Sequence, residues 1–508
     1  MKLIFTLLFL SIGILAYGTT YYLSPTGSDF NPGTKNNPFF TLNKAWSVVS
    51  AGDIIYLRGG TYHFLSQQNL SGKNGTVNDT IKIWGYPGEK PILSKHPTGY
   101  ATPGWPQSLI YLRGDYTWWK DIEIANYTQA TAVIWNGMAL RLSNHNRLER
   151  LNSHHNGHGL LIMNSSSENL VLNCDFHHNY DPLNNYGNAD GVEFANNEST
   201  ALNTIRGCRM WNNSDDGLDL WENNGSVVVD NCWSWNNGYK EDGVTTGGNG
   251  GGFKFGKTST EDGTEFKRTV TNCLSVYNRL VGYNQNAAIV KFYFYNNIAY
   301  KNNTGIDFFS NDLAHIFRNN ISFDNKSANW NGAHSNAIID HNSNNGGWQT
   351  TGPAASAADF ISLDTAGISG PRKPDGSLPD INFMHLTEGS DLIDAGVDVG
   401  LPYNGSAPDI GAFERAPNTA IIPSVNNQKI KIYPNPARNL INISEDASSS
   451  VSRTFRAFDI SGTLCIETNL DRGINNYRIP VNLRPGVYIL QINAGSVNLF
   501  VGKLIIVE

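Results

Sequence analysis

The sequence has no excess of positive charge, and it lacks an apolar run long enough to cross a membrane. Its 508 residues carry a formal net charge of −7, which argues against a nucleic-acid or anionic-membrane partner. The one candidate stretch, from Leu3 to Ala16, is too short to span a bilayer. Through the central region, asparagine, glycine, threonine and valine replace the usual helix formers. These absences argue against a membrane-spanning, nucleic-acid-binding or mainly helical protein.

The short apolar stretch is instead predicted to belong to a secretory signal peptide covering residues 1–18. Lys2 supplies the charged start, and Ala16-Tyr17-Gly18 provides a cleavage site. The mature protein is therefore expected to be exported and soluble, with enough length for a large core and an accessory domain.

Cysteine is scarce, and its count of five is odd for an exported protein. Four of the cysteines occupy one position of an internal repeat, whereas Cys465 lies in a different part of the chain. Stacked neighbours have parallel Cβ vectors, which is poor geometry for a disulfide. We therefore expect these four to be small buried apolar residues; they are Cys174, Cys208, Cys232 and Cys273.

The repeat is most visible as an asparagine that recurs through the middle of the chain. The usual interval is 23 or 24 residues, with two longer intervals. A unit of this length is too short for a helical hairpin and is typical of a solenoid of short strands. It predicts an all-β fold, a right-handed parallel β-helix, in which stacked asparagines hydrogen-bond to one another. These asparagines are Asn156, Asn179, Asn213, Asn237, Asn278, Asn302 and Asn325.

The solenoid is predicted to span residues 19–415. Residues 41–49 are expected to form a short amphipathic helix that caps its open end, because exposed strand edges promote aggregation. Residues 360–415 are expected to form a closing coil and a wrap. A linker at residues 416–428 then leads to residues 429–508, where alternating strand and turn signals predict a small β-sandwich.

This C-terminal part resembles a type IX secretion sorting domain. The features that carry the resemblance are Tyr433-Pro434-Asn435-Pro436 and the terminal strand, residues 503–508. The resemblance implies that the type IX machinery exports the chain through the outer membrane, so that it is secreted or held at the cell surface. A carbohydrate-binding sandwich is the alternative.

Three strand segments of the solenoid share one pattern, a glycine turn followed by an apolar-polar-apolar triplet. Alternate side chains of a strand point to opposite faces, so Glu193, Asp219 and Lys254 should form one outward, solvent-facing row. Asp190 and Asp216 stand three residues before the first two. By itself an outward lysine is usually solvated, and Asp-Gly pairs usually form turns. Converging carboxylates, however, repel one another without a cation, so the pattern predicts a hard-cation site beside a possible base.

The solenoid resembles polysaccharide lyase family 9, a family of secreted pectin-degrading β-helix enzymes. The resemblance rests on Asn188-Ala189-Asp190-Gly191, on the run from Trp211 to Leu220 and on Gly252-Phe253-Lys254. It implies that the matching aspartates bind catalytic Ca²⁺ and that Lys254 is the base. Those aspartates are Asp190, Asp215, Asp216 and Asp219. Glu193 departs from the family pattern, and it is either a further ligand or the mark of a different substrate subfamily.

The expected reaction is β-elimination on a uronate of an acidic plant cell-wall polysaccharide of the pectin class. Calcium can bridge the acidic protein and the polymer, neutralise the uronate carboxylate and stabilise the enolate-like intermediate. We expect a monomer acting on pectate (homogalacturonan), and rhamnogalacturonan I is the alternative substrate. Candidates for contacts with flanking sugars are Arg206, Arg209, Lys257 and Arg279.

Two other function classes stay open on the sequence. Glycoside hydrolase family 28 also has a β-helix and uses motifs like Asn188-Ala189-Asp190, Asp215-Asp216 and Gly157-His158-Gly159. Here the histidine motif precedes the acids, whereas in that family it follows them, and the family's Arg-Ile-Lys is missing. The other class is a non-catalytic surface β-helix that uses calcium only to stabilise its fold.

Overall fold

The computed structural model describes residues 18–258, 266–309, 313–332, 335–415, 430–444, 452–458, 464–474, 476–494 and 497–506. The chain divides into two compact units, residues 1–417 and 418–508. The predicted signal peptide, apart from Gly18, and the predicted linker at residues 416–428 lie outside the described residues. Within the described part, no helix is long and apolar enough to cross a membrane.

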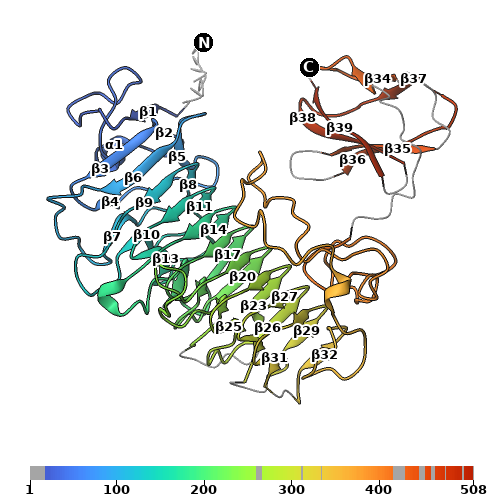
Figure 1. Ribbon diagram of the computed structural model, residues 1–508. Helices are drawn as coiled ribbons and strands as arrows, with labels where there is room; N and C mark the ends of the chain where they lie inside the picture. Colours follow the sequence, from blue (N-terminus) through green and yellow to red (C-terminus); the bar gives the residue numbers. More distant parts are fainter. Residues whose placement is uncertain are drawn as a thin grey trace, which may run out of the picture. The chain divides into compact units, whose positions relative to one another are not determined.

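The first unit is a right-handed parallel β-helix built from three long parallel sheets (Figure 1). Sheet A has twelve strands: β1 (Thr20–Leu23), β2 (Ile54–Leu57), β5 (Ile81–Gly85), β8 (Thr117–Lys120), β11 (Arg147–Glu149), β14 (Leu170–Leu172), β17 (Leu202–Arg206), β20 (Ser226–Asp230), β23 (Phe266–Thr271), β26 (Lys291–Tyr295), β29 (Ile316–Arg318) and β32 (Ile338–Asp340).

Sheets B and C have ten strands each. Sheet B contains β3 (Gly60–Phe64), β6 (Pro91–Lys95), β9 (Glu123–Ala125), β12 (Asn152–His154), β15 (Asp175–His177), β18 (Arg209–Trp211), β21 (Trp233–Trp235), β24 (Leu274–Val276), β27 (Ile298–Tyr300) and β30 (Ile321–Phe323). Sheet C contains β4 (Gln68–Leu70), β7 (Ser108–Leu112), β10 (Asn136–Arg141), β13 (His158–Met163), β16 (Val192–Ala195), β19 (Leu218–Asp219), β22 (Phe253–Lys254), β25 (Val281–Asn284), β28 (Thr304–Asp307) and β31 (Ala328–Asn331).

The apolar positions of the strands fill the inside of the solenoid. The triplets of the sequence pattern behave as predicted: Val192, Leu218 and Phe253 pair in register on neighbouring strands of sheet C, and all three are fully buried. Stacking also continues inside the core, where the rings of Phe253 and Tyr283 lie parallel with centroids 5.0 Å apart. Each coil therefore buries its apolar face against the next, which fixes the register of the outward positions as well.

The predicted asparagine ladder is confirmed. The Asn213 side-chain amide donates to Asn237 Oδ1 at 3.0 Å, and that of Asn237 donates to Asn278 Oδ1 at 2.9 Å. The backbone N–H groups of Asn213 and Asn237 donate to the same oxygens. Because these asparagines are buried at the turn between sheets B and C, the ladder satisfies polar groups that no water reaches.

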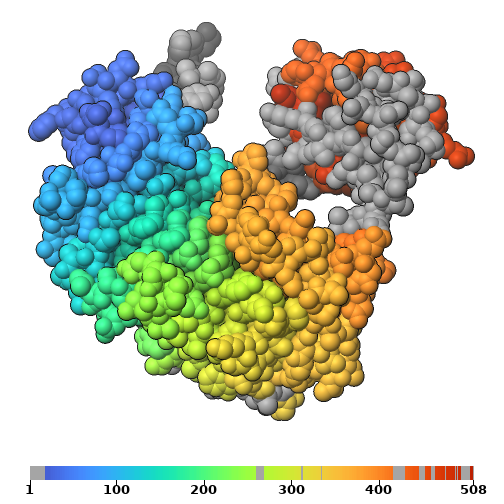
Figure 2. Space-filling model, viewed as in Figure 1, coloured from blue at the N-terminus to red at the C-terminus, as the bar shows by residue number. Residues whose placement is uncertain are grey.

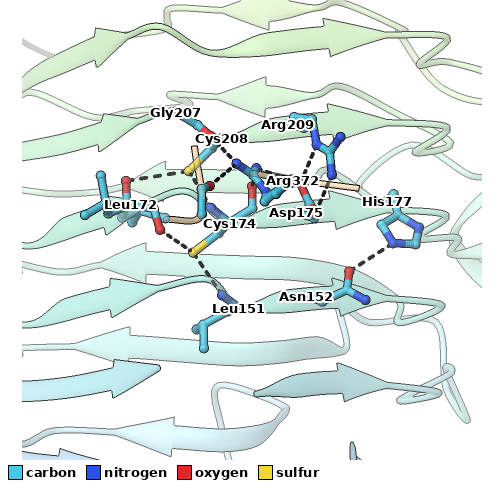
Figure 3. A network of polar contacts seen from close by, with 12 residues as sticks. Leu151, Asn152, Leu172, Cys174, Asp175, His177, Gly207, Cys208, Arg209 and Arg372 are labelled. Atoms are coloured by element: carbon cyan, nitrogen blue, oxygen red, sulfur yellow. Dashed lines mark hydrogen bonds and ion pairs between the residues drawn. The ribbon is translucent and has the colours of Figure 1, made fainter. Parts of the chain in front are cut away.

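The repeat cysteines are free and buried, as predicted. Their sulfur atoms form a second ladder: Cys174 Sγ accepts the Leu151 N–H at 3.3 Å, and Cys208 Sγ accepts the Cys174 N–H at 3.3 Å (Figure 3). Asn297 continues this ladder by accepting the Cys273 N–H at 3.0 Å. At this position the cysteine Sγ therefore accepts a backbone N–H from the neighbouring coil, as an asparagine Oδ1 does.

A short helix, α1 (Leu42–Val48), lies beside the first coils, where a capping helix was expected. The Thr41 hydroxyl accepts the Lys44 N–H at the N-terminus of the helix. Leu42, Ala45 and Trp46 are buried on its inner face, so the helix shields apolar side chains at the start of the core.

Residues 360–415 are a wrap but not a closing coil, which corrects half of the prediction. Residues 341–415 are all described and add no strand to the three sheets. After η2 (Ala357–Asp359) the segment packs on the outward side of sheet B, where Phe383 and Leu386 share an apolar cluster with Trp233 and Ile298. Figure 2 shows this orange segment lying against the coils. The outer face of sheet B is apolar from β21 to β30, and this wrap packs on that part of the face.

The second unit consists of two small antiparallel sheets that share a core. The first contains β33 (Lys431–Tyr433), β34 (Leu440–Ser444) and β37 (Asn476–Pro480), and the second contains β36 (Leu464–Leu470), β35 (Arg453–Phe458), β38 (Gly486–Ala494) and β39 (Val497–Ile506). Ile441 from one sheet and Phe455 and Leu490 from the other lie in one buried cluster. This is the predicted β-sandwich.

Candidate active site

The outward row predicted on sheet C exists. Glu193 of β16 pairs with Asp219 of β19, and Asp219 pairs with Lys254 of β22. The row continues with Leu161 of β13 on one side and Asn284 of β25 on the other. Three polar side chains from successive coils therefore stand side by side, held by the same register that stacks the core.

The row is not open to solvent, contrary to the prediction. Asp219 is 5 % exposed and Lys254 is 8 % exposed. Both line a cavity of about 220 Å³ with Asn188 and Asn249, which come from the long loops between β15 and β16 and between β21 and β22. The loops turn an exposed sheet face into a half-open polar cavity with largely buried lining side chains, and this burial strengthens the charge interactions in it.

Carboxylates from successive coils converge in this cavity. Asp190, Asp216 and Asp219 each bring an oxygen within 4.8 Å of the others, and the Asp216 N–H donates to Asp190 Oδ1 at 2.8 Å. Asp219 Oδ1 is buried and has no hydrogen-bond partner among the described residues. Buried oxygen ligands with an unsatisfied acceptor suit a hard divalent cation such as calcium.

The glycine-rich stretch before Lys254 is explained by its approach to these carboxylates. The Asn249 N–H donates to Asp215 Oδ1, and the Gly251 N–H donates to Asp216 Oδ1. A Cβ on Gly251 would lie 2.9 Å from Asp216 Oδ1, and one on Gly248 would collide with Asp215. Only glycine at these two positions lets the backbone pass close enough to donate.

The acids carry strongly raised pKa values. Burial, with the neighbouring Asp216 carboxylate, raises the pKa of Asp190 to about 8. Burial, with Asp216 and Asp190, raises the pKa of Asp215 to about 10. Burial also raises the pKa of Asp219, although Lys254 opposes it. The cluster therefore needs protons or a cation to exist in this enclosed space.

Lys254 lies within reach of two of these acids. Its Nζ donates to Asp219 Oδ2 at 2.8 Å and lies 3.0 Å from Asp216 Oδ2. Burial lowers the pKa of Lys254, but the charges of Asp216, Asp219 and Asp190 outweigh burial and raise it overall. Lys254 therefore keeps its proton as long as the carboxylates beside it are ionised and their charge is not compensated.

His158 is a site residue whose role the sequence did not reveal, although its Gly-His-Gly motif was visible. It is fully buried at the start of β13, with Nε2 3.7 Å from Asp190 Oδ2 and 3.6 Å from Glu193 Oε2. Burial lowers the pKa of His158, while burial raises the pKa of Glu193 to about 8. Glu193 therefore lies at the edge of the cluster, beside His158 on one side and in register with Asp219 on the other.

Trp221 is a second residue that sequence reasoning missed. Its ring lines the cavity, and the Nζ atoms of Lys254 and Lys257 lie 5.5 Å and 5.6 Å from its centroid. It is 40 % exposed. The signal was present, because Trp221 follows Asp219 by two residues and so falls on the same face of the chain.

Of the four basic residues predicted to contact flanking sugars, two lie near the cavity on sheet C and two do not. Arg279 donates to the carbonyls of Gly248 and Asn249, so it supports the loop over the carboxylates. Lys257 lies beside Trp221, as described above. The remaining two, Arg206 and Arg209, are elsewhere.

Arg206 lies on sheet A and pairs with Asp230 at 2.8 Å. Arg209 lies on sheet B and pairs with Asp175 at 2.7 Å (Figure 3), and it donates to the wrap carbonyl of Gly370. Arg372 of the wrap also donates to Asp175 Oδ1, at 2.7 Å. Through these contacts Arg209 anchors the wrap. The structure brings neither Arg206 nor Arg209 to the cavity on sheet C.

The chain is similar to proteins of known family and structure. Residues 21–345 match the family model described as Pel9A-like, right-handed beta helix region, and residues 431–507 match the secretion system C-terminal sorting domain. Pectate lyase L of Dickeya dadantii is 34 % identical over 411 residues, covering 78 % of this chain and 90 % of the relative.

Two solved structures share the fold along nearly their whole length. The crystal structure of pectate lyase Pel9A has a TM-score of 0.66 and 32 % identity, and the match covers 80 % of this chain and 98 % of that one. A rhamnogalacturonan lyase has a TM-score of 0.60 and 28 % identity, covering 74 % of this chain and 98 % of that one.

Proposed function

The chain belongs to the Pel9A-like right-handed β-helix family and is a polysaccharide lyase, and we propose that it cleaves a uronate-containing pectic polymer by calcium-dependent β-elimination at the cavity on sheet C. The single observation that carries the proposal is the contact of Lys254 Nζ with Asp216 and Asp219, two acids of the convergent cluster. A base and a cation site then share one cavity.

Four aspartates are the proposed metal ligands. Asp190, Asp216 and Asp219 converge within 4.8 Å, and Asp215 lines the same cavity. Bound there, calcium would neutralise the uronate carboxylate and so make the C5 proton acidic enough to remove. Asn249 and Gly251 hold two of these carboxylates through their N–H groups, which orients the ligands before substrate arrives.

Lys254 is the proposed base. Its Nζ must lose its proton before it can accept the C5 proton, and the ionised acids around it hold that proton in place. Once the charge of those acids is compensated, burial remains as the dominant influence, and burial lowers the pKa of a lysine. Calcium binding by these carboxylates would therefore favour the neutral form of Lys254, which is the form that can act as a base.

The proposal is tested by incubating the protein with polygalacturonate and with the rhamnogalacturonan I backbone, with calcium and with excess chelator. Elimination creates an unsaturated uronate, so ultraviolet absorbance should rise on at least one polymer in calcium and stay flat in chelator. New reducing ends without absorbance would indicate a hydrolase. No change on any polymer would indicate a non-catalytic β-helix.

The C-terminal unit is a secretion sorting domain, and the protein is secreted to the cell surface. We propose that the type IX secretion machinery exports it and that a signal peptide at residues 1–18 starts the route.

Removing this domain should not change catalysis. All the proposed ligands, Lys254 and the wrap lie before residue 416. A chain ending at Arg415 is expected to keep the full-length kcat and KM on soluble substrate, measured by the same absorbance. A severalfold rise in KM would instead identify the domain as a polysaccharide-binding module.

A further inference from the structure

A second cavity adjoins the acid cluster on sheet C and takes no part in the proposed chemistry. Its volume is about 570 Å³. It shares Ile134, Asn188 and Glu193 with the cavity of the carboxylates, so the two spaces are neighbours along the row. A polymer whose uronate lies over the carboxylates would place a flanking sugar here.

The floor of the second cavity is apolar. Leu161 and Met163 of β13 and Ala195 of β16 line it, and with Ala139 of β10 they form a buried cluster outside the solenoid core. Leu161 occupies the position that Glu193 occupies one coil later. A coil advances about 4.8 Å, close to the length of one sugar, so a sugar next to the reacting uronate meets Leu161 and Met163.

The described lining of this cavity offers no positive charge to bind the carboxylate of a second uronate. Glu193 is the one charged residue that lines it in the described part of the chain. A carboxylate over Leu161 would meet no cation among the described residues that line the cavity, and it would lose hydration against the apolar floor. A neutral sugar with an apolar face avoids both costs and buries its methyl group on the floor.

Polar atoms at the wall can still hold sugar hydroxyls. Asn136 is 2 % exposed, its amide donates to the Gln107 carbonyl at 3.0 Å, and its Oδ1 has no hydrogen-bond partner among the described residues. Asn136 lines the cavity, so Oδ1 is available to accept a hydroxyl proton. A sugar can satisfy this buried acceptor with a hydroxyl group and place an apolar face on the floor at the same time.

The coil on the far side of this floor, which contains β10, carries a basic residue. Arg141 of β10 pairs in register with Met163, and its guanidinium stacks on the Trp105 ring at 4.9 Å. One coil of apolar floor thus lies between the carboxylate cluster and an arginine, which matches a polymer whose acidic sugars alternate with neutral ones.

We propose that this cavity is a subsite for a neutral sugar carrying a methyl group, a 6-deoxyhexose, and that the enzyme therefore acts on a backbone in which uronate alternates with that sugar. The assignment rests on the proposed lyase function and names its substrate class. It replaces homogalacturonan with the rhamnogalacturonan type as the expected substrate. A methyl-esterified uronate offers the same chemistry, and the experiment separates the two.

The test compares kcat/KM on the alternating backbone, on polygalacturonate and on methyl-esterified polygalacturonate. One methyl group in an apolar site changes kcat/KM by about 10-fold or more, so the wild type should prefer the alternating backbone to polygalacturonate by at least about that factor. In Leu161→Lys, a lysine on the floor should lower activity on the alternating backbone and raise it on polygalacturonate, reducing the preference at least about 10-fold.

Two further variants keep this result interpretable. Val133 lines the same cavity and is 41 % exposed, so Val133→Lys adds the charge without burying it and should shift the preference in the same direction. Asn331 is an exposed member of the row three coils beyond Lys254. Asn331→Lys adds the same charge away from the subsite and should leave the preference unchanged.

A wild type that prefers polygalacturonate, with unsaturated products on it, would overturn the subsite and leave the lyase function standing. A preference for the methyl-esterified polymer would overturn the 6-deoxyhexose assignment. If no polymer yields unsaturated product, the lyase function fails; tighter binding of the alternating backbone than of polygalacturonate in affinity electrophoresis would still support the subsite, and equal binding would overturn it.

Discussion

Lys254→Ala is expected to reduce turnover to about one per cent of wild type or less, with calcium and substrate binding largely kept. General-base catalysis contributes roughly 10²–10⁴-fold, and the loss lies in the transition state, so kcat should fall while KM changes little. Lys254 Nζ lies 2.8 Å from Asp219 Oδ2, in the cluster where the uronate is to be held. The measurement is ultraviolet absorbance at saturating substrate, with calcium binding followed by calorimetry.

Lys254→Arg distinguishes a base from a counter-ion. A guanidinium keeps a positive charge beside Asp216 and Asp219 but stays protonated, because its pKa is above about 12. It should therefore preserve the fold and fail to restore turnover. An alanine variant that retains a third of wild-type turnover, or an arginine variant close to wild type, would remove Lys254 from the role of base.

Removing calcium is expected to abolish turnover while the solenoid stays folded. The stacked core and the asparagine ladder account for the fold without a metal, so circular dichroism should change little in excess chelator. Added calcium should restore activity. Magnesium should restore it poorly, because it demands a tighter octahedral geometry than a site of several carboxylates provides.

Asp219→Asn is the matched variant for the metal experiment. It keeps the size of the side chain and removes one charge from the cluster, so it should need much more calcium for half-maximal activity. Full activity of the wild type in excess chelator, or an Asp219→Asn variant with unchanged calcium dependence, would contradict the calcium mechanism.

The row of the active site could be read from the sequence because two periodicities agree. The asparagine interval sets the coil, and the alternation within a strand sets the face, so Glu193, Asp219 and Lys254 had to coincide once the solenoid was assumed. The same reasoning identified the buried cysteines and the inward apolar residues. These are consequences of local pattern, which a single sequence contains.

The enclosure of the site could not be read in the same way. Loops without a repeat decide that Lys254 is 8 % exposed, and no periodicity specifies how such loops fold. The wrap does not form the predicted coil, because its apolar residues pack on the outer face of sheet B and not on the next turn of the solenoid. The charge of Arg206 and Arg209 is visible in the sequence, but charge does not say which of the three sheets a residue joins.

The mass of the products formed from the alternating uronate backbone distinguishes β-elimination from hydrolysis. Elimination leaves a new non-reducing end that is lighter by one water than the end left by hydrolysis. Every new non-reducing end made by the wild type in calcium is expected to have the lighter mass, and Lys254→Ala is expected to make almost none. Products that have gained a water, or lighter products that Lys254→Ala makes at the wild-type rate, would contradict elimination with Lys254 as the base.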